Sequence, residues 1–312
     1  MDVSIIVPLL NEDESLEELF LWIKDVMNNN NFIFEVIFID DGSKDKSWSV
    51  IESLKAKYPE VKGIKFQRNY GKSAALQVGF EMAKGDFVAT MDADLQDSPE
   101  EVPEMIELIK SKGLDLVSGW KKKRFDPLSK TIPTKLYNWT ARKITGITLH
   151  DFNCGIKTYR SEVVKSIELY GDMHRYIPVL AKYAGFNQIG EKEVKHQARK
   201  YGKSKFGMNR FVNGPLDLMT VFFMGKFGKK PMHFFGVWGI LMFLIGFSLF
   251  LFLTIDKLFI DTNAKLLAER TEFFIALTCM LLGVQFFLTG FLAEMIGRNS
   301  GTRNHYLIEK TI

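Results

Sequence analysis

The fold class of this chain is decided by the stretch Asp86-Phe-Val-Ala-Thr-Met-Asp92-Ala-Asp94-Leu-Gln96-Asp-Ser-Pro99-Glu100. The run from 87 to 91 is apolar or β-branched and is bounded by a glycine and a carboxylate-rich turn, which predicts a short buried strand. Asp92 and Asp94 lie two residues apart, so in an extended chain both carboxylates leave the same side of the strand end. Together with the amide oxygen of Gln96 they form a set of oxygen donors that suits Mg2+ or Mn2+. The alternative is an acidic turn that caps the helix beginning at Ser98-Pro99-Glu100.

Strand and helix patterns alternate along the first 118 residues. Buried strands are predicted at residues 3–7, 35–39, 63–67, 87–91 and 114–118, and helices at about 12–30, 45–57, 72–84 and 100–112. This alternation, with short connections, predicts an α/β fold: a mostly parallel, Rossmann-like sheet with helices on both faces. Ligands of such sheets bind beyond the carboxyl ends of the strands.

Polar residues follow four of these predicted strands. They are Asn11 and Glu12, preceded by Pro8; Asp40 and Asp41; Arg68, Asn69 and Lys72; and Asp92 and Asp94. Because the carboxyl ends of parallel strands meet at one edge, we expect the four groups to converge on one crevice. No G-x-G-x-x-G follows the first strand, and residue 66 is Phe66 where a P-loop needs its first glycine, so both of those nucleotide-binding classes are excluded. Lys72 and the start of its helix offer an anion site, with a solvated lysine as the alternative.

The net charge of +4 conceals a strong asymmetry along the chain. Residues 1–118 carry 12 Lys and Arg against 23 Asp and Glu, whereas residues 119–231 carry 23 against 8. The basic side chains of the second segment include Lys121, Lys122, Lys123, Arg124, Lys130, Lys135, Arg142, Lys143, Arg199, Lys203 and Lys205. A basic surface of this kind meets an anionic partner, either nucleic acid or phospholipid.

Two long uncharged runs, at about 232–255 and 273–293, identify the partner as a membrane. Each is long enough to cross a hydrocarbon core of about 30 Å as a helix, so we predict a two-helix transmembrane hairpin. The stretches 136–144 and 211–227 are predicted to be amphipathic segments on the bilayer surface, with core helices as the alternative. The expected organisation is a catalytic domain at 1–207, an interfacial segment at 208–231, the spans within 232–296 and a cytosolic tail at 297–312.

The N-terminus shows neither a basic region nor a long apolar run, so no signal peptide is predicted and the large domain is expected to face the cytosol. Lys226, Lys229 and Lys230 before the first span, with Arg298 and Arg303 after the second, favour cytosolic ends. Two cysteines, one inside a span, exclude a disulfide framework and a cysteine zinc site.

At these motifs the chain resembles the family 2 glycosyltransferases of the GT-A fold. The motifs are Pro8-Leu-Leu-Asn11-Glu12, Ile39-Asp40-Asp41-Gly42-Ser43, Arg68-Asn69-Tyr-Gly71-Lys72-Ser73 and Met91-Asp92-Ala-Asp94-Leu-Gln96-Asp97. Later segments resemble the polyprenyl-phosphate hexose synthases with two C-terminal spans, such as dolichyl-phosphate mannose synthases and bacterial undecaprenyl-phosphate glucosyltransferases. These segments are Leu149-His-Asp151-Phe-Asn-Cys154-Gly155-Ile-Lys157, His174-Arg175 and the run 196–206.

The resemblance implies a role for each matching position. Pro8, Asn11, Glu12, Asp40, Asp41, Asn69 and Lys72 would bind the nucleotide. Asp92, Asp94 and Gln96 would hold Mg2+ or Mn2+ at the diphosphate, and Asp151 would be a third catalytic residue, near the sugar. Arg124, Thr134, Arg199, Ser204 and Lys205 would bind the acceptor phosphate. Leu9-Leu10, Thr134 and Asn153 depart from the family pattern, where an aromatic residue, Ser and Gly are expected.

The sequence thus predicts an inverting, metal-dependent transfer of one hexose to undecaprenyl phosphate at the bacterial inner membrane. The donor is a nucleotide diphosphate sugar, with UDP-glucose preferred by analogy over GDP-mannose and UDP-N-acetylglucosamine. The alternatives are transfer to a glycolipid or glycan hydroxyl, which needs a general base, and a non-catalytic nucleotide-sugar binding module. A nucleic-acid partner is not expected, because the basic half lacks a recognised binding module. A homo-oligomer is compatible with the sequence.

Overall fold

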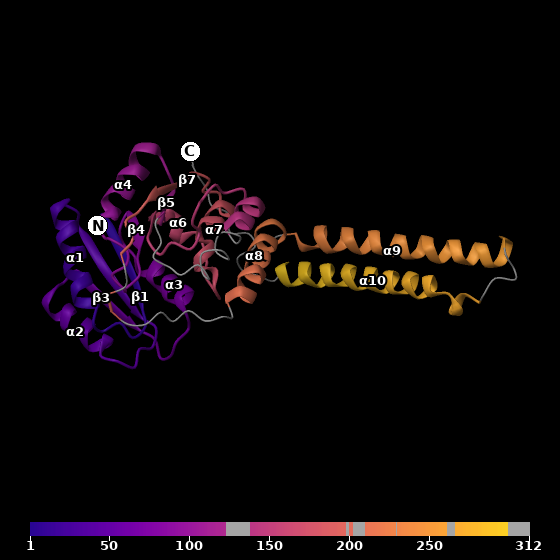
Figure 1. Cartoon of the computed structure of the whole chain (residues 1–312), viewed down its shortest axis with the longest axis horizontal. Helices are drawn as coiled ribbons and strands as arrows, with labels where there is room; N and C mark the ends of the chain where they lie inside the picture. The colour runs from indigo at the N-terminus through magenta and orange to yellow at the C-terminus, as the bar shows by residue number, and fades with distance from the viewer. Residues whose placement is uncertain (123–137, 198–199, 202–209, 229, 261–265, 299–312) are drawn as a thin grey trace. The chain divides into compact units, whose positions relative to one another are not determined.

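The structure is a computed structural model that describes residues 1–122, 138–197, 200–201, 210–228, 230–260 and 266–298 (Figure 1). The chain divides into two compact units, Met1–Phe222 and Phe223–Ile312, each of which is described by itself below.

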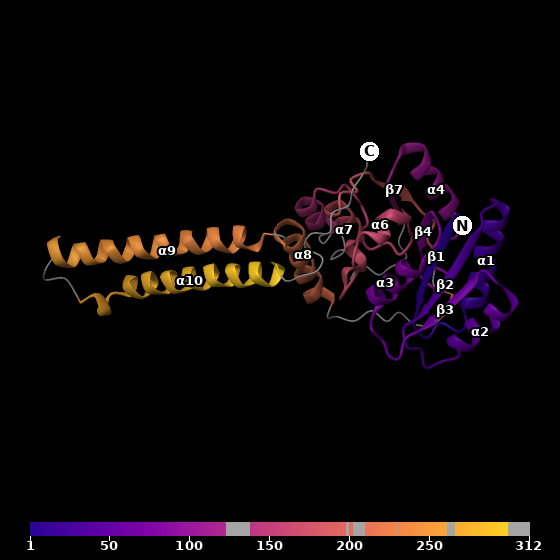
Figure 2. The ribbon, with the colours of Figure 1, turned by 180° about the vertical axis from the view of Figure 1, so that it is seen from behind.

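A seven-stranded sheet in the order β3-β2-β1-β4-β6-β5-β7 forms the centre of the first unit (Figure 2). Its strands are β1 (Val3–Leu9), β2 (Phe34–Asp40), β3 (Val61–Lys65), β4 (Phe87–Thr90), β5 (Leu116–Trp120), β6 (Lys157–Arg160) and β7 (Ile189–Glu193). β6 runs antiparallel to both of its neighbours, β4 and β5, and the other pairs are parallel. The predicted mostly parallel sheet is confirmed, with β6 as an antiparallel insertion that the sequence patterns did not indicate.

Helices cover both faces of this sheet, as predicted. One face carries α1 (Leu16–Asn29), α2 (Ser47–Lys57) and α4 (Glu101–Lys112), and the other carries α3 (Lys72–Met82), α6 (Ser161–Lys165), the short η1 (Met173–Tyr176) and α7 (Ile177–Tyr183). Successive β1 residues explain the two layers, because Ile5 packs into the first apolar core and Ile6 into the second. A parallel strand buried on both faces reads as a continuous apolar run.

The antiparallel strand brings two distant parts of the chain together. Thr90, the last residue of β4, is paired in register with Lys157, the first residue of β6. The loop that precedes β6 therefore lies beside the carboxyl end of β4, which is the edge where the sequence predicts a ligand.

The predicted surface segments are helical where the structure describes them. α8 (Arg210–Phe227) is one continuous helix through Gly214-Pro215. Residues 138–145 are also helical; Trp139 is 53% exposed and the Lys143 Nζ lies 5.3 Å from its ring centroid. An exposed aromatic ring beside a lysine is typical of a helix at a membrane interface.

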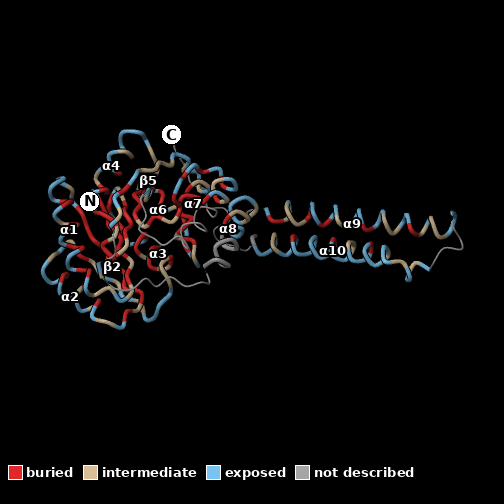
Figure 3. The backbone as a smooth tube through the Cα atoms, viewed as in Figure 1, coloured by how far each residue is buried: buried red, intermediate tan, exposed pale blue. Residues whose placement is uncertain are grey.

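The second unit contains α9 (Pro231–Ile255) and α10 (Thr271–Arg298), joined through the π-helical turn η2 (Asp256–Ile260) and the 3-10 turn η3 (Leu267–Glu269). Both long helices are apolar and long enough to cross a membrane. Only 22% and 17% of their most apolar windows are buried, so they are not core helices of a soluble domain (Figure 3). An added Cβ at Gly283 would lie 2.7 Å from the Gly239 carbonyl oxygen, so the two backbones touch at glycines.

Candidate active site

The carboxyl ends of β1 and β2 are held together by hydrogen bonds between the loops that follow them. The Asn11 N–H donates to Ser43 Oγ (2.8 Å), and Asn11 Oδ1 accepts from the Lys44 N–H (2.8 Å). The Glu12 N–H donates to Ser47 Oγ (3.0 Å). The first two groups of predicted nucleotide-binding residues are therefore neighbours, with Pro8 half-buried in β1 beside them.

Asp40, at the end of β2, is fully buried. Its Oδ1 accepts from the Ser43 N–H (2.7 Å), whereas its Oδ2 meets no hydrogen-bond donor among the described residues. An unpaired buried carboxylate oxygen is costly, and a donor from a ligand would satisfy it. Asp40 is predicted to bind the nucleotide, and recognition of an N–H group of the base would require an acceptor of this kind.

Asp41 ties β2 to the loop after β3. Its Oδ1 accepts from the Tyr70 N–H (2.7 Å) and its Oδ2 from the Gly71 N–H (2.9 Å). Burial raises the pKa of Asp41, although these two N–H groups oppose the shift. Gly42 has φ +78°, and a Cβ there would lie 2.6 Å from the Arg68 carbonyl carbon. Glycine at this position therefore lets the loop after β3 pack closely against the loop after β2. Asn69, in the loop after β3, is exposed.

Lys72, the first residue of α3, forms an ion pair with Asp92 after β4. Burial disfavours the charged carboxylate, but Lys72, with Lys121 and His174, holds the pKa of Asp92 well below its usual range. The third and fourth groups of predicted residues thus meet, and the predicted convergence of polar groups is present in the structure.

Asp94 and Gln96 continue the turn after Asp92. Asp94 is buried and its Oδ1 accepts from the Gln96 N–H (3.2 Å), while Gln96 Nε2 donates to the Gln197 carbonyl (3.3 Å). Within the described ranges no cluster of three or more His, Cys, Asp and Glu could hold a metal by itself. Mg2+ binds through one or two carboxylates plus substrate phosphates, so two aspartates and an amide oxygen still fit such an ion.

A cluster of Lys121, Asp97 and His196 lies next to this turn. Lys121 Nζ lies 2.6 Å from Asp97 Oδ1, and His196 Nδ1 lies 3.7 Å from the same oxygen. Asp97 and His196 also form an isolated antiparallel bridge, and the Gln197 N–H donates to the Gln96 carbonyl (2.9 Å). Lys121, which the sequence places on a basic surface, is instead paired with the buried carboxylate of Asp97.

Asp151 is buried in the loop before β6. Its Oδ1 accepts from the Asn153 N–H (3.0 Å). The backbone N–H groups of His150 and Asp151 both donate to Glu191 Oε1 of β7 (2.8 and 3.1 Å), which fixes this loop on the sheet. Asp151 is not among the residues lining the cavity described next, so its catalytic role stays a prediction.

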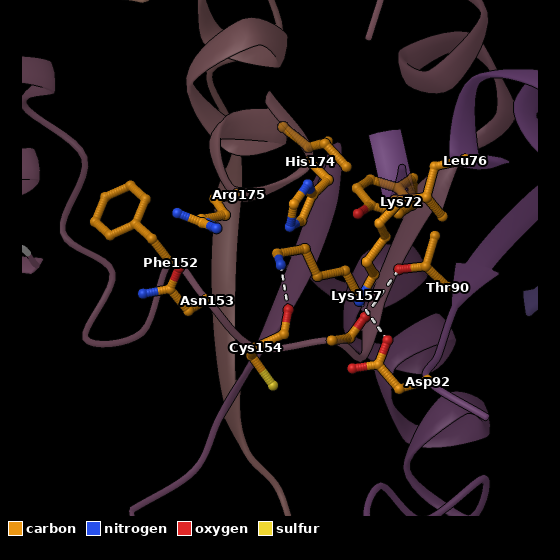
Figure 4. Close-up of a pocket in the computed structure, with 13 residues that line it drawn as sticks. Lys72, Leu76, Thr90, Asp92, Phe152, Asn153, Cys154, Lys157, His174 and Arg175 are labelled. Carbon is orange, nitrogen blue, oxygen red and sulfur yellow. Dashed lines mark hydrogen bonds and ion pairs between the residues drawn. The ribbon is translucent and has the colours of Figure 1, made fainter. Parts of the chain in front are cut away.

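A cavity of about 180 Å³ lies beside Asp92, between the ends of α3, β4 and β6 and the turn η1 (Figure 4). It is lined by Lys72, Leu76, Thr90, Asp92, Phe152, Asn153, Cys154, Gly155, Lys157, Tyr159, His174, Arg175 and Ile177. A Cβ on Gly155 would lie 2.5 Å from Asp92 Oδ2, so a larger residue there would collide with the carboxylate. Burial raises the pKa of the Cys154 thiol to about 12, which favours the protonated thiol at neutral pH.

One predicted group of residues lies outside the part of the chain that the structure describes, and two residues of the cavity wall have no role predicted from the sequence. The five predicted acceptor residues, Arg124, Thr134, Arg199, Ser204 and Lys205, lie outside the described residues, and their roles stay predictions. Conversely, Lys157 and Arg175 lie in segments that resemble the family, but the sequence assigns them no role. The signal for Lys157 is its position between the apolar or β-branched Ile156 and Thr158, a pattern in which a lysine is unusual.

Comparison with known proteins agrees with this geometry. Residues 4–168 match the model of glycosyl transferase family 2. The chain is 35% identical to a dodecaprenyl-phosphate galacturonate synthase of Rhizobium johnstonii, covering 96% of this chain and 88% of that protein. It is 33% identical to an undecaprenyl-phosphate 4-deoxy-4-formamido-L-arabinose transferase of Aeromonas hydrophila, covering 95% and 88%.

Solved structures share the fold at low sequence identity. The mannosyl-3-phosphoglycerate synthase of Rubrobacter xylanophilus has a TM-score of 0.57 at 16% identity, covering 70% of this chain and 73% of that one. The glucosyl-3-phosphoglycerate synthase of Mycobacterium tuberculosis, solved with Mn2+, uridine diphosphate and phosphoglyceric acid, has a TM-score of 0.56 at 16% identity, covering 72% and 78%. With the GT-A sheet, the family match and these relatives in agreement, the chain is a glycosyltransferase and belongs to glycosyl transferase family 2.

Proposed function

We propose that this enzyme transfers one sugar from a nucleotide diphosphate sugar to a polyprenyl phosphate at the cytosolic face of the bacterial inner membrane. The observation that carries the proposal is the placement of Asp92: it pairs with Lys72 at the carboxyl edge of the sheet and lines a cavity there. Both relatives compared above are named for transfer to a polyprenyl phosphate, which supports that acceptor. Their names give two different sugars, so they leave the sugar open.

The chain's own residues have distinct tasks in this reaction. Asp40 accepts from the base, and Lys72, with the N-terminus of α3, binds the diphosphate. Asp92, Asp94 and Gln96 would hold a divalent ion, which when bound neutralises the negative charge of the leaving diphosphate. Mn2+ in the mycobacterial structure is consistent with such a site, and either Mg2+ or Mn2+ would serve.

The transfer breaks the bond from the sugar C1 to the diphosphate oxygen and forms a bond from C1 to an oxygen of the acceptor phosphate, with inversion. Positive charge develops on the sugar as the first bond breaks. Asp151 is proposed to stabilise that charge.

The kind of acceptor determines whether the protein must supply a general base. A phosphomonoester has its second pKa at about 6, so at neutral pH it is already a nucleophile and needs no strong base. It does need cations that hold it in line. Arg124, Thr134, Arg199, Ser204 and Lys205 are proposed for that task, and α9 and α10 would anchor the enzyme where the lipid is found.

Lipid extraction after reaction tests this proposal. The full chain, purified in detergent, is incubated with undecaprenyl phosphate, Mg2+ or Mn2+, and a panel of labelled nucleotide sugars that includes UDP-glucose, the donor preferred by analogy. We expect label in the organic phase with at least one donor, and none when the lipid is left out. Label that stays in the aqueous phase with every donor would refute the proposal.

A further inference from the structure

The loop before β6, residues 149–156, is held at its two ends by different strands. Near β6, Thr90 Oγ1 of β4 donates a hydrogen bond to the Gly155 carbonyl (3.1 Å). The other end carries Asp151, and it is bound by the side chain of Glu191 from β7, the strand at the edge of the sheet. The position of Asp151 therefore depends on a strand that the sequence did not connect with the site.

Both carboxylate oxygens of Glu191 bind this end of the loop. Oε1 accepts from the backbone N–H groups of His150 and Asp151 (2.8 and 3.1 Å), and Oε2 lies 2.6 Å from His150 Nδ1. An ionised carboxylate can only accept, so the His150 ring donates from Nδ1 in this contact. Hydrogen bonds to a charged group are about twice as strong as neutral ones, so one side chain holds two consecutive loop residues firmly.

The sheet keeps this carboxylate in place. Glu191 pairs in register with Ser118 of β5, and its side chain is only 13% exposed. The His150 ring stacks on Trp120, the last residue of β5, with centroids 4.3 Å apart and an angle of 17° between the planes. Because a site supported on strands is held more precisely than one supported on loops, the Asp151 end of the loop has a defined position on β5 and β7.

The helix at residues 138–145 contacts the same end of the loop through a different group. Asn138 Nδ2 donates to the His150 carbonyl (2.9 Å), whereas Glu191 accepts from the N–H group of Asp151. Asp151 is 1% exposed, and a buried N–H group that loses its acceptor is costly. Removal of the Glu191 carboxylate should therefore let Asp151 shift even though the contact with Asn138 remains.

A shift of Asp151 would also reach the cavity beside Asp92. The four residues that follow Asp151 line this cavity, and Asp151 Oδ1 accepts from one of them, the Asn153 N–H (3.0 Å) (Figure 4). Glu191 itself is not among the described residues that line the cavity. Any effect of Glu191 on the reaction would therefore pass through the loop and not through a contact with substrate.

We propose that Glu191 is a positioning residue of the transferase, which sets the place of the Asp151 carboxylate during sugar transfer. The inference rests on the proposed function, in which Asp151 stabilises the positive charge that develops on the sugar, and it adds β7 to the parts of the fold that act in the reaction. A misplacement of about 1 Å in a group that acts on the transition state can lower the rate about a hundredfold.

Steady-state kinetics of Glu191 variants give the first test, with undecaprenyl phosphate and a labelled nucleotide sugar that the wild-type chain uses. Glu191→Ala should lower kcat about 10- to 100-fold, while the KM values for donor and lipid change less than about threefold. Glu191→Gln keeps an oxygen that can accept from both backbone N–H groups, so it should lose less than about fivefold.

Glu193→Ala is the matched control. Glu193 points from the same strand two residues later, its side chain is 55% exposed, and its carboxylate lies 3.2 Å from Lys122 Nζ. An exposed ion pair of this kind contributes little, so this variant should keep the wild-type kcat.

A double-mutant cycle with Asp151→Asn separates positioning from a general loss of stability. Asp151→Asn alone should lower kcat about tenfold or more, because the negative charge is removed. In that background Glu191→Ala should lower kcat less than about threefold further, since the carboxylate that it positions is already absent. The same cycle with Glu191→Asp, which keeps the charge but draws it back by one methylene, does not depend on the folding of the alanine variant.

Four outcomes are decisive. Wild-type kcat in Glu191→Ala, or the same loss of kcat in both backgrounds, would overturn the inference. A raised donor KM at unchanged kcat would overturn it as well, by assigning Glu191 to donor binding. Wild-type kcat in Asp151→Asn would leave no catalytic carboxylate to position, although the transferase function would stand. No transfer from any donor by the wild-type chain would instead contradict the proposed function itself.

Discussion

Lys72 and Asp92 form an ion pair that joins the first turn of α3 to the turn after β4. The pair links the residues expected to bind the diphosphate with those expected to hold a divalent ion, although 20 positions separate them in the sequence. One edge of the candidate active site is thereby assembled from two segments that a parallel α/β sheet brings together.

Lys72→Met should lower kcat/KM for the donor by about 10- to 100-fold, because a charge-assisted contact to the diphosphate contributes about 1.5–3 kcal/mol. Steady-state kinetics with varied donor concentration measure this effect, and Lys72→Arg should recover part of the loss. Wild-type kinetics in a folded Lys72→Met protein would show that the lysine only neutralises Asp92.

Removal of divalent ions with EDTA should abolish transfer, and added Mg2+ or Mn2+ should restore it. Asp94→Ala should lower kcat by about a hundredfold or more even with excess metal, since electrostatic stabilisation of the leaving group is lost. Membrane fractionation should find the variant inserted like the wild type. Full activity in EDTA, or wild-type turnover of Asp94→Ala, would exclude the metal role.

The contacts of Glu35 in β2 should make the stability of the folded protein depend on pH. Its Oε1 accepts from Ser4 Oγ (2.6 Å) and the Lys84 N–H (2.8 Å), and its Oε2 pairs with Lys62. Burial alone would raise the pKa of Glu35, but these partners together hold it below its ordinary value. The stabilisation is therefore present above the ordinary pKa of about 4.3 and is lost as the pH falls through the lowered native value.

Glu35→Gln should lower the free energy of unfolding at pH 7 by about 1–3 kcal/mol, because the ion pair with Lys62 is lost. The difference from the wild type should shrink as the pH falls below about 4.3. Denaturant unfolding followed by near-ultraviolet circular dichroism from pH 3 to 7 measures both curves. A difference that does not change with pH would contradict this assignment.

Gly283→Leu should separate α9 from α10. A Cβ at this position would lie 2.6 Å from the Phe243 nitrogen, so the helix backbones must move apart. Size-exclusion chromatography in detergent should show less monodisperse protein and thermal unfolding at a lower temperature. Leu281→Ala, at a side chain 63% exposed, is the control and should behave like the wild type.

The first half of the fold was predictable because its signals are local. Apolar runs such as 3–7 and 35–39 are buried on both faces of the sheet. In the helices between them, apolar residues recur at helical spacing. The four polar groups at the strand ends could be located in the same way, since parallel topology fixes their common edge.

The antiparallel insertion was not predictable from those signals. β6 has four residues and begins with a buried lysine, so neither length nor apolar pattern distinguishes it from a loop. The sequence therefore assigns no role to Lys157 and Arg175, because only the tertiary structure places both residues in the wall of one cavity. Lys121 likewise looked like part of a basic surface, and only its contact with Asp97 shows that it is internal.

Mass spectrometry of the lipid after reaction tests the central claim most directly. With purified enzyme, a donor it uses and undecaprenyl phosphate, the account predicts one sugar added per lipid phosphate and one nucleoside diphosphate released for each. A lipid of unchanged mass with every donor, or a lipid carrying more than one sugar, would contradict transfer of a single sugar to a polyprenyl phosphate.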